Sequence, residues 1–564
     1  MIPRPDIPAE RIETNQANGW WRSDRTFVDD FLDRVAEQPD KVAVIAHVAQ
    51  TGDVHTVSYR QLGTMVDRTA LGLMELGVEA GDIVSFQLPN WWQFPVISMA
   101  CSRVGAVVNP MLPIFRAREV RYILQALGSK VFFMPQRFRR FDYVEMLAEF
   151  RDELPVLERA YTVGGDGTAG LPGFEETFLG HRWEDEHDVS RLDARRVEPN
   201  EVAEVQFTSG TTGRPKGVVH TPNTIYASYR AVYESLGLTR DTVVHTPSTM
   251  AHQTGFLNGC VMALGEGMKV VYQDVWDARV MLELIQDEGI SYTAGATPYM
   301  IDLCQKVEEL REQGIDHDLS SFEIFKSGGA AVPAIVPQRM RDVVGARIVM
   351  SWGMTENGCL TITRRDAPPQ ETAASDGFPL PWAQLKVTDF EGNPLPAGES
   401  GVLWIKGASQ CVDYYPDHEV WVGSYDEDGW FNTGDLARIN PDGSLRITGR
   451  VKEMIIRGGE NIPVAEVESA LASHADIAEA AIVAVPDDRL GERAWAVVVP
   501  ATGVEHVDVD ELKRHLEELG MVKQYWPEYF SVQDALPRTA SGKVRKNEVR
   551  AAVLEEFESM TART

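Results

Sequence analysis

The sequence contains few cysteines, and none is placed for pairing. Only five occur in 564 residues, an odd number, and no two have the CxxC spacing of a redox or zinc motif. Single, scattered cysteines are typical of free thiols in a reducing compartment. We therefore expect no disulfide scaffold and a cytoplasmic location. The cysteines are Cys101, Cys260, Cys304, Cys359 and Cys411.

Long hydrophobic runs are also missing. No stretch reaches the roughly 18 apolar residues that span a bilayer. The most apolar segment, 94–112, is interrupted by prolines, serines, a glycine and Arg103. The first residues contain no apolar signal core. The sequence therefore predicts no stable membrane insertion.

Positive charge is in deficit. The chain carries 54 Lys and Arg residues against 84 Asp and Glu residues, a formal net charge of −30. Because nucleic acids and anionic lipids are bound by clustered basic residues, this balance argues against a nucleic-acid-binding protein. Small anionic ligands stay compatible, since they respond to the local field. With 44% apolar and 24% charged residues, the composition is that of a globular protein, and the length allows roughly three to five domain-sized units.

Apolar runs alternate with helical patterns over two long stretches, about 41–136 and 202–350. Short apolar runs such as 42–46 and 83–88 are separated by segments with helical spacing. Strands that alternate with helices of this length predict βαβ units and a mostly parallel sheet. The intervening segment 164–200 is polar and rich in turn residues, which indicates a surface excursion.

The pattern changes after about residue 361. Short alternating runs are joined by turn sequences such as Asn440-Pro441-Asp442-Gly443, which predicts an antiparallel β-rich subdomain over about 361–449. The runs are 385–389, 401–406, 436–439 and 444–448.

Past residue 449 the chain has the pattern of a compact α+β unit. Helices are predicted at 464–471, 509–519 and 545–557, with strands between the first two. The predicted fold class is therefore α/β. It has a large N-terminal domain of parallel-rich sheets with helices and a β-rich subdomain, followed by a small α+β C-terminal domain.

A run of Gly, Ser and Thr residues follows the strand predicted at 205–207. It extends from Thr208 to Gly217 and reads TSGTTGRPKG. Glycines let the backbone turn its amides inward, hydroxyls add donors and Lys216 adds charge, so the loop suits phosphate oxygens. It lacks the Gly-Lys-Ser/Thr ending of a P-loop. A flexible polar surface loop is the alternative, but the preceding strand and the embedded lysine favour the phosphate cradle.

A second segment, 351–357, follows another predicted strand. It offers an aromatic plane at Trp352, a hydroxyl at Thr355 and a carboxylate at Glu356. These groups suit a base, a phosphate and Mg²⁺ in that order. The segment is weak evidence by itself.

Two later segments end on a charged residue. The turn 430–435 ends on Asp435, whose carboxylate can accept both hydroxyls of a ribose, although an aspartate that stabilises its own turn is as common. The segment 537–543 places Lys543 on a loop of small residues ahead of a helix, where a solvated lysine is the default.

In this order and spacing, the four segments resemble the adenylate-forming superfamily of acyl-CoA synthetases, non-ribosomal peptide adenylation domains and firefly luciferase. The chain is most similar to acyl-CoA synthetases of the medium-chain fatty-acid and cyclohexanecarboxylate type. The resemblance implies an N-terminal adenylation domain over 1–449, a hinge at 450–452 and a mobile lid domain over 453–564. It also implies the activity: ATP converts a carboxylic acid to acyl-AMP and pyrophosphate, and the acyl group is transferred to CoA.

The resemblance assigns roles to matching positions. Lys543 would enter the site for adenylation, Thr355 would contact the α-phosphate and Glu356 would hold Mg²⁺. Trp352 stands where a tyrosine usually stacks on the base, and Lys452 matches the hinge. The ATP phosphates would be held by Thr208, Ser209, Gly210, Thr211, Thr212, Gly213 and Lys216. The other nucleotide contacts would be Gly328, Gly329 and Ala330 beside adenine, Gly353 next to the stacking residue, and Asp435 and Arg450 at the ribose. The CoA arm would meet Gly458, Gly459 and Glu460.

The same resemblance implies a lid movement and an acid pocket. After adenylation the lid would rotate about the hinge, withdraw Lys543 and present the loop at 458–461 beside the pantetheine arm, where glycine permits close approach. A plain strand-to-helix turn is compatible with that loop. In the segment 251–256, His252 would lie near the carboxylate of the acid; a structural role carries equal weight for a lone histidine.

Alternatives to a CoA ligase stay open at this point. A stand-alone adenylating enzyme that loads a carrier protein would share all four segments, although no carrier domain is appended. A non-catalytic nucleotide-binding protein is disfavoured because every charged role is filled. Small residues along the predicted pocket suit a branched or cyclic acid or one of modest chain length. A homodimer is the commonest default for the oligomeric state.

Overall fold

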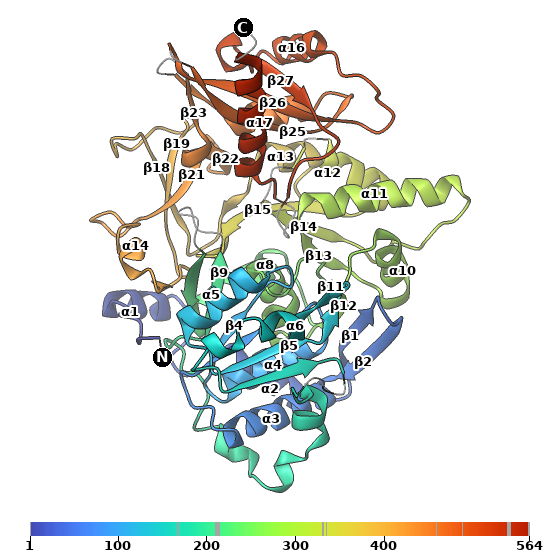
Figure 1. Ribbon diagram of the computed structural model, residues 1–564, viewed down its shortest axis with the longest axis vertical. Coiled ribbons are helices and arrows are strands. Elements are labelled where there is room, and N and C mark those ends of the chain that lie inside the picture. Colours follow the sequence, from blue (N-terminus) through green and yellow to red (C-terminus); the bar gives the residue numbers. More distant parts are fainter. Residues whose placement is uncertain are drawn as a thin grey trace.

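The chain forms a large N-terminal body, a small β-rich subdomain and a C-terminal domain at the far end of the long axis (Figure 1). This description rests on a computed structural model. The residues that it describes are 2–165, 167, 170–208, 215–329, 332–333, 335–457, 460–487, 489–538 and 543–561, with the backbone only at 460, 461 and 561.

The larger sheet of the N-terminal body has the strand order β17-β16-β15-β14-β13-β11-β12-β1-β2. Pairing is parallel from β1 to β15 and antiparallel at the edges, where β2, β16 and β17 lie. The predicted parallel core is confirmed. The strands are β1 (Val42–Val48), β2 (Asp53–Ser58), β11 (Val243–His245), β12 (Lys269–Gln273), β13 (Tyr292–Gly295), β14 (Ile324–Gly328), β15 (Arg347–Met354), β16 (Gly358–Ile362) and β17 (Phe378–Pro379).

A second sheet has the order β20-β10-β9-β4-β3-β5-β8. Its strands from β9 to β8 run parallel, and β10 and β20 close one edge in antiparallel pairing. The strands are β3 (Ile83–Phe86), β4 (Val107–Pro110), β5 (Val131–Pro135), β8 (Arg159–Val163), β9 (Glu204–Thr208), β10 (Lys216–His220) and β20 (Asp413–Tyr415); a separate ribbon joins β6 (Arg137–Phe138) to β7 (Phe141–Asp142).

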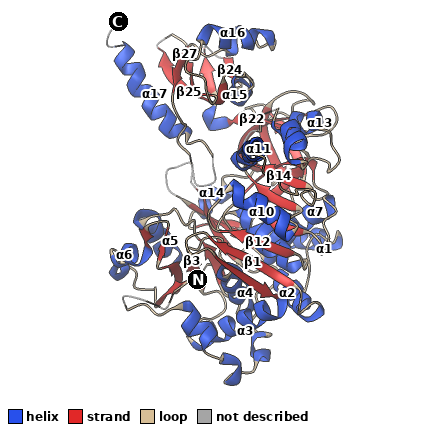
Figure 2. Ribbon diagram, turned by 90° about the vertical axis from the view of Figure 1, so that its right-hand side faces the viewer, coloured by secondary structure: helices blue, strands red, loops and turns tan. Residues whose placement is uncertain are grey.

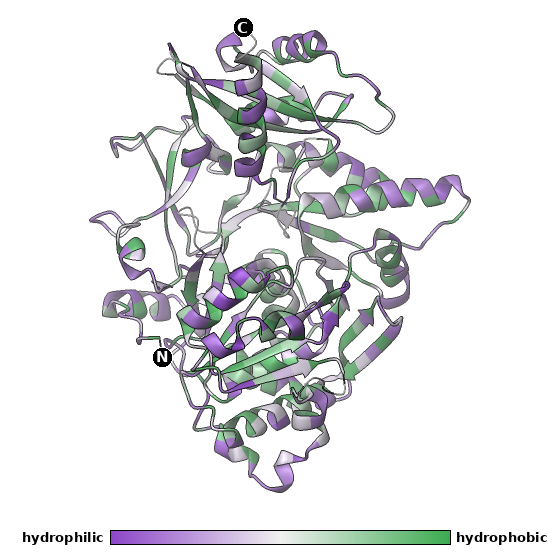
Figure 3. Cartoon of the chain, in the orientation of Figure 1, coloured by the Kyte–Doolittle hydropathy of each residue, from purple (hydrophilic) through white to green (hydrophobic). Residues whose placement is uncertain are grey.

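Helices cover these sheets, and apolar residues concentrate on the strands and on the inner helices (Figures 2 and 3). Every residue of α4 is buried, whereas α3 begins with a capping box between Ser58 and Gln61 and packs on α4 with one face. The helices are α1 (Ala9–Ala17), α2 (Phe27–Glu37), α3 (Tyr59–Glu75), α4 (Gln93–Arg103), α5 (Ala117–Leu127), α6 (Tyr143–Ala148), α7 (Pro222–Ser235), α8 (Gln253–Gly255), α9 (Ala263–Gly265), α10 (Ala278–Glu288), α11 (Thr297–Glu312), α12 (Val336–Arg339) and α13 (Pro369–Ala374).

The polar segment predicted as a surface excursion folds back over α3. Its short helical turns pack against that helix, and Arg68 of α3 donates three hydrogen bonds to the Glu184 carboxylate, at 2.6, 2.8 and 2.9 Å. The helical turns with 3₁₀ or π geometry are η1 (Arg151–Glu153), η2 (Glu175–Gly180), η3 (Trp183–Asp185), η4 (Val189–Leu192), η5 (Phe256–Met262) and η6 (Met340–Val344).

The predicted β-rich subdomain is an antiparallel sheet of order β18-β19-β21-β22. Two of its strands are longer than the sequence indicated: the predicted 436–439 is only the end of β21, and the predicted 444–448 extends to Arg450. The elements are β18 (Gln384–Thr388), β19 (Gly401–Lys406), α14 (His418–Val422), β21 (Phe431–Ile439) and β22 (Leu445–Arg450).

The C-terminal domain is an α+β unit, as predicted. Its sheet is covered on one face by α15 and α16, through residues such as Leu471 and Leu516, and on the other by α17, through Val549 and Val553. The elements are η7 (Val451–Glu453), β23 (Ile455–Arg457), β24 (Glu460–Ile462), α15 (Val464–Ala472), β25 (Ile477–Asp487), β26 (Gly491–Pro500), α16 (Val509–Glu518), η8 (Lys523–Tyr525), β27 (Tyr529–Val532) and α17 (Lys546–Thr561).

The composition predicted neither a membrane-spanning helix nor a disulfide scaffold. Among the described residues, no helix combines the length and the apolar character needed to cross a membrane. All five cysteines are buried as free thiols.

Candidate active site

The expected phosphate-binding segment begins and ends on two paired strands. Thr208 ends β9 and Lys216 begins β10, and the two residues pair across the antiparallel ladder. The hairpin therefore brings the lysine back beside the threonine. The residues between them that were predicted to bind phosphate, Ser209, Gly210, Thr211, Thr212 and Gly213, lie outside the described residues.

Lys216 and Glu356, predicted from separate motifs, form an ion pair in the structure. Lys216 Nζ lies 2.8 Å from Glu356 Oε1. The Tyr414 hydroxyl donates to the same oxygen at 2.8 Å, and the ammonium lies 3.8 Å from the centre of the Tyr414 ring, a cation–π contact. Tyr414 thus contacts both members of the pair.

The charge state of this cluster follows from its contacts. Burial opposes the ionisation of Glu356, but the charge of Lys216 and the hydrogen bonds from Lys216 and Tyr414 outweigh burial and lower the pKa of Glu356. Burial lowers the pKa of His220 to about 4, so its imidazole is neutral at pH 7, with Nε2 donating to the Thr355 carbonyl at 2.7 Å. His220 thereby holds the turn that carries Thr355 and Glu356.

Trp352 and Gly353 do not follow a strand, as the sequence suggested, but lie within β15. The strand continues to Met354 because β16 pairs with its end. A Cβ on Gly353 would lie 1.7 Å from the Gly358 carbonyl oxygen, so only glycine fits this crossing. Thr355 and Glu356 form the turn that connects the two strands.

The Asp435 carboxylate is held by two partners. Trp352 Nε1 donates to Asp435 Oδ2 at 3.0 Å, and Arg450 Nε lies 3.0 Å from Oδ1. Burial raises the pKa of Asp435, while the charge of Arg450 and the hydrogen bond from Trp352 act in the opposite direction. Three residues predicted to bind adenosine therefore lie together.

A residue of the C-terminal domain reaches the N-terminal body at this place. A Cβ built on Gly329 would lie 3.5 Å from Lys543 Cε and 3.7 Å from Lys543 Nζ. Gly329 follows β14 with a φ of +82°, which favours glycine. A Cβ on Gly328 would lie 2.5 Å from the Ser351 carbonyl oxygen. Ala330, the third expected member of this wall, lies outside the described residues.

The electrostatics of Lys543 agree with this placement. The residue keeps contact with solvent, but partial desolvation and then the charge of Arg450 lower its pKa, while Asp435 and Glu356 act in the opposite direction. Burial, with a further contribution from Lys543, lowers the pKa of His252 to about 4. His252 caps α8, its Nδ1 accepting from Thr254 N at 3.4 Å, and is neutral at pH 7.

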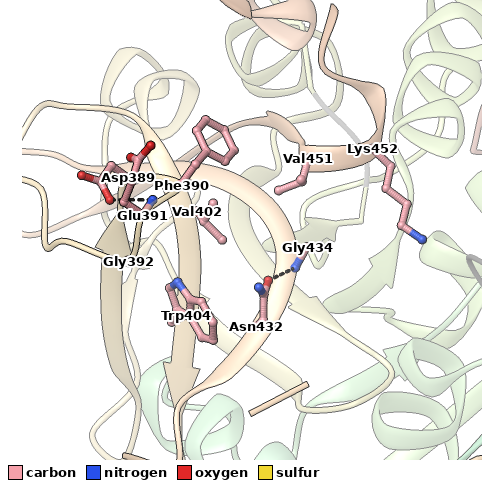
Figure 4. A pocket seen from close by; sticks show the side chains of 10 residues that line it. All are labelled: Asp389, Phe390, Glu391, Gly392, Val402, Trp404, Asn432, Gly434, Val451 and Lys452. Atoms are coloured by element: carbon pink, nitrogen blue, oxygen red, sulfur yellow. Dashed lines mark hydrogen bonds between the residues drawn. The ribbon is translucent and has the colours of Figure 1, made fainter. Parts of the chain in front are cut away.

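Lys452 of the predicted hinge lies at a cavity, whereas Arg450, the first hinge residue, reaches Asp435. Lys452 is exposed on η7, directly after β22. With Trp404, Phe390 and Gly434 it lines a cavity of ≈ 540 Å³, and it lies at the opposite edge of that cavity from the Phe390 loop (Figure 4). Gly434 lines this cavity, while Asp435, the next residue of β21, directs its side chain to Trp352 and Arg450, because successive side chains of a strand point to opposite faces.

One of the residues predicted to meet CoA, Glu460, lies on a described strand. Glu460 begins β24 and pairs with Arg457 of β23. Gly458 and Gly459, which connect the two strands, lie outside the described residues.

The donors present suit a magnesium ion. No three His, Cys, Asp or Glu side chains gather into a metal cluster within the described ranges. Mg²⁺, however, is usually held by one or two carboxylates together with substrate phosphates, and the ionised Glu356 beside the phosphate hairpin provides such a carboxylate. The site therefore fits Mg²⁺ bound jointly with ATP.

Two residues of the site were missed from the sequence. Tyr414 follows no recognisable motif and reaches Glu356 only because β20 pairs with β10. His220 lies four residues after Lys216, at the end of the same strand. A polar residue at the end of a Val-rich run was the sequence signal that could have indicated it.

Comparisons with known proteins identify the family of the chain. A profile of the family described as AMP-binding enzyme matches residues 31–415, and one for the AMP-binding enzyme C-terminal domain matches 466–543. A medium-chain fatty-acid–CoA ligase of Escherichia coli (strain K12) is 33% identical over 550 residues, 97% of this chain and 94% of the relative. A 2,3-dihydroxybenzoate-AMP ligase of Bacillus subtilis (strain 168) is 31% identical over 552 residues, 98% and 97% of the two chains.

A solved structure gives the same fold. The anthranilate CoA ligase AuaEII in complex with anthranoyl-AMP superposes with a TM-score of 0.83 at 22% identity, over 94% of this chain and 98% of that chain. The chain belongs to the family of AMP-binding enzymes. Within that class it is an AMP-forming acid–thiol ligase, an acyl-CoA synthetase, and the family reaction is adenylation followed by thioester formation.

Proposed function

We propose that this enzyme activates a hydrophobic carboxylic acid of medium chain length, or an alicyclic or aromatic one, as its CoA thioester, in the cytoplasm and with Mg²⁺. The observation that carries the site assignment is the position of Lys543 beside Gly329, where a Cβ built on the glycine would lie 3.5 Å from Lys543 Cε. It brings a cation from the C-terminal domain to the edge of the nucleotide site. The printed names of the relatives support acids of this range: a medium-chain fatty acid for one and 2,3-dihydroxybenzoate for another.

In the first half-reaction, a carboxylate oxygen attacks the α-phosphorus of ATP. A phosphorus–oxygen bond forms to the acid, and the bond to pyrophosphate breaks. Two anions must approach each other, so the positive charge of Lys543 is placed to offset their repulsion. The β9–β10 hairpin with Lys216 would hold the phosphates, and Trp352, Asp435 and Arg450 the adenosine. When bound at Glu356, Mg²⁺ would neutralise charge on the leaving pyrophosphate.

In the second half-reaction, the CoA thiol attacks the acyl carbonyl and AMP leaves. Lys543 has no task in this step. We assign the lid to residues 453–564 and its hinge to 450–452, and the exposed position of Lys452 between two sheets supports that assignment. Rotation there would remove Lys543 and bring the segment 458–460 toward the pantetheine arm.

We assign the neutral His252 to the binding of the acid. Because its imidazole carries no charge at pH 7, it can donate a hydrogen bond to the acid carboxylate without adding a second cation beside Lys543. The five buried free thiols support a reducing compartment. A homodimer is the proposed assembly, on the general frequency of that state alone.

The experiment is an acid panel read in two stages. Linear, alicyclic and aromatic acids are incubated with ATP and Mg²⁺, and exchange of radiolabelled pyrophosphate into ATP is measured. CoA is then added and the products are identified by mass. Exchange with any acid, followed by its acyl-CoA, is the expected result. No exchange with any acid would contradict the site assignment.

A second candidate, loading of a carrier protein, shares the first stage. The Bacillus relative is named as an AMP ligase rather than a CoA ligase, which is the observation that supports this candidate. Acyl-AMP that persists after CoA is added, and is consumed only by a phosphopantetheinylated carrier protein, would favour this candidate over the CoA ligase.

A further inference from the structure

Trp352 contributes more than an aromatic plane to the nucleotide site. It lies on β15 of the nine-stranded sheet, whereas Asp435 lies on β21 of the small antiparallel sheet. The indole Nε1 donates to Asp435 Oδ2 at 3.0 Å. Both residues are buried, with 7% and 4% of their surface exposed. The hydrogen bond therefore joins the two sheets at the adenosine site.

The second oxygen of the same carboxylate is held from another direction. Arg450 Nε lies 3.0 Å from Asp435 Oδ1, and this buried oxygen accepts no hydrogen bond from the described residues. A carboxylate has about four acceptor positions. Among the described residues, the indole N–H is thus the directional donor to this carboxylate, while the charge of Arg450 attracts the other oxygen without a hydrogen bond.

We propose that Trp352 is a positioning residue for sugar recognition: its indole N–H fixes the Asp435 carboxylate so that the enzyme selects ribonucleotides over deoxyribonucleotides. The inference rests on the proposed function, in which Asp435 accepts the ribose hydroxyls. Base and ribose are separated by a fixed covalent distance, so one side chain that offers its ring face to the base and its N–H edge to the carboxylate aligns both subsites.

Selectivity is the property that this hydrogen bond controls. Without the indole N–H, Asp435 can rotate toward Arg450 and meet the ribose hydroxyls in a less fixed geometry. A hydrogen bond to a charged group contributes roughly 10- to 100-fold in an equilibrium constant. Binding of 3′-deoxy-ATP, which offers one hydroxyl fewer, should depend less on that geometry than binding of ATP.

The test measures dissociation constants rather than activity. ATP, 2′-deoxy-ATP and 3′-deoxy-ATP are titrated by calorimetry without acid substrate into the full-length enzyme and into Trp352→Phe, which keeps a ring but lacks the N–H. The preference for ATP over each deoxy-nucleotide should fall about tenfold. The matched control is Trp382→Phe: Trp382 is also buried, and its Nε1 donates to the Ala227 carbonyl at 3.1 Å. Its preference should equal that of the wild type.

A variant of the same shape guards against loss of folding. Benzothienylalanine incorporated at position 352 replaces the N–H by sulfur and should reproduce the reduced preference. An unchanged preference in a folded Trp352→Phe or benzothienylalanine enzyme overturns the inference. Asp435→Ala distinguishes a wrong role for Trp352 from a wrong assignment of the ribose site. If Asp435→Ala keeps the ribose preference, the ribose assignment in the proposed function is wrong as well; if it loses the preference while Trp352→Phe keeps it, only the role of Trp352 is wrong.

Discussion

Replacement of Lys543 by alanine tests the division of labour between the two half-reactions. The ammonium group lies beside Gly329, and in the proposed reaction an attacking carboxylate and the α-phosphate of ATP would both face it there. Removing it leaves their repulsion without a counter-charge in the adenylation transition state. The thiol attack on acyl-AMP involves no such encounter, so that step should persist.

The size of the effect can be worked from the geometry. Two unit charges about 4 Å apart interact by roughly 4 kcal/mol at an effective dielectric constant of about 20, a suitable value here because Lys543 keeps contact with solvent. An energy of about 4 kcal/mol in the transition state corresponds to roughly a thousandfold in rate. We therefore expect adenylation to slow by about three orders of magnitude.

The assay follows each half-reaction separately. A single turnover with radiolabelled ATP gives the rate of acyl-AMP formation, and acyl-CoA production from preformed acyl-AMP gives the rate of the second step. The matched control is Lys523→Ala in the same domain, since Lys523 is exposed and contacts only surface neighbours among the described residues: Glu517, at 3.2 Å, and the ring of Trp526. Equal losses in both half-reactions, or equal losses in the two variants, would refute the reasoning.

Three further changes test the hinge, the metal and the core. Lys452→Pro restricts backbone rotation at the hinge and should slow mainly the CoA step; unchanged turnover would remove the hinge assignment. Glu356→Gln should raise the Mg²⁺ concentration for half-maximal pyrophosphate exchange at least about tenfold, and an unaltered Mg²⁺ titration would point to another carboxylate. Burial raises the pKa of Glu204 from 4.5 to about 8. Between these two pH values the carboxyl is protonated in the folded state but ionised in the unfolded chain, so the folded state loses stability as the pH rises from 4.5 to 8. Glu204→Gln should therefore increase the free energy of unfolding at pH 7.5 by at most about 4 kcal/mol, which is measured as a higher thermal midpoint, and should have little effect at pH 5. Equal shifts of the midpoint at the two pH values would contradict the raised pKa.

Local pattern was sufficient for most of the scaffold. The Val-rich runs that begin at Val42, Lys269 and Arg347 are strands β1, β12 and β15, because apolar β-branched residues between helices suit a sheet buried on both faces. The change from parallel to antiparallel architecture was also visible, since turn sequences such as 440–443 connect neighbouring strands directly.

What the sequence did not predict depends on register and on distant partners. β15 runs through Trp352 because β16 pairs with it, and that pairing determines where the aromatic ring lies. The bond from Trp352 to Asp435 joins residues 83 positions apart, and no local pattern encodes which sheet edges meet. Motifs therefore indicated the members of the site, whereas their contacts required the fold.

The ion pair between Lys216 and Glu356 changes how a mutation of the phosphate hairpin must be interpreted. Only 5% of the Glu356 side chain is exposed, and an ionised carboxylate in that position is costly without a partner. Lys216→Ala would therefore remove a phosphate contact and at the same time raise the pKa of Glu356, which weakens any metal held there. Lys216→Arg keeps the charge near Glu356 but alters the geometry toward phosphate. A loss of ATP affinity in both variants would show that Lys216 acts by contacting phosphate. A loss confined to Lys216→Ala would show that it acts by keeping the Glu356 carboxylate ionised.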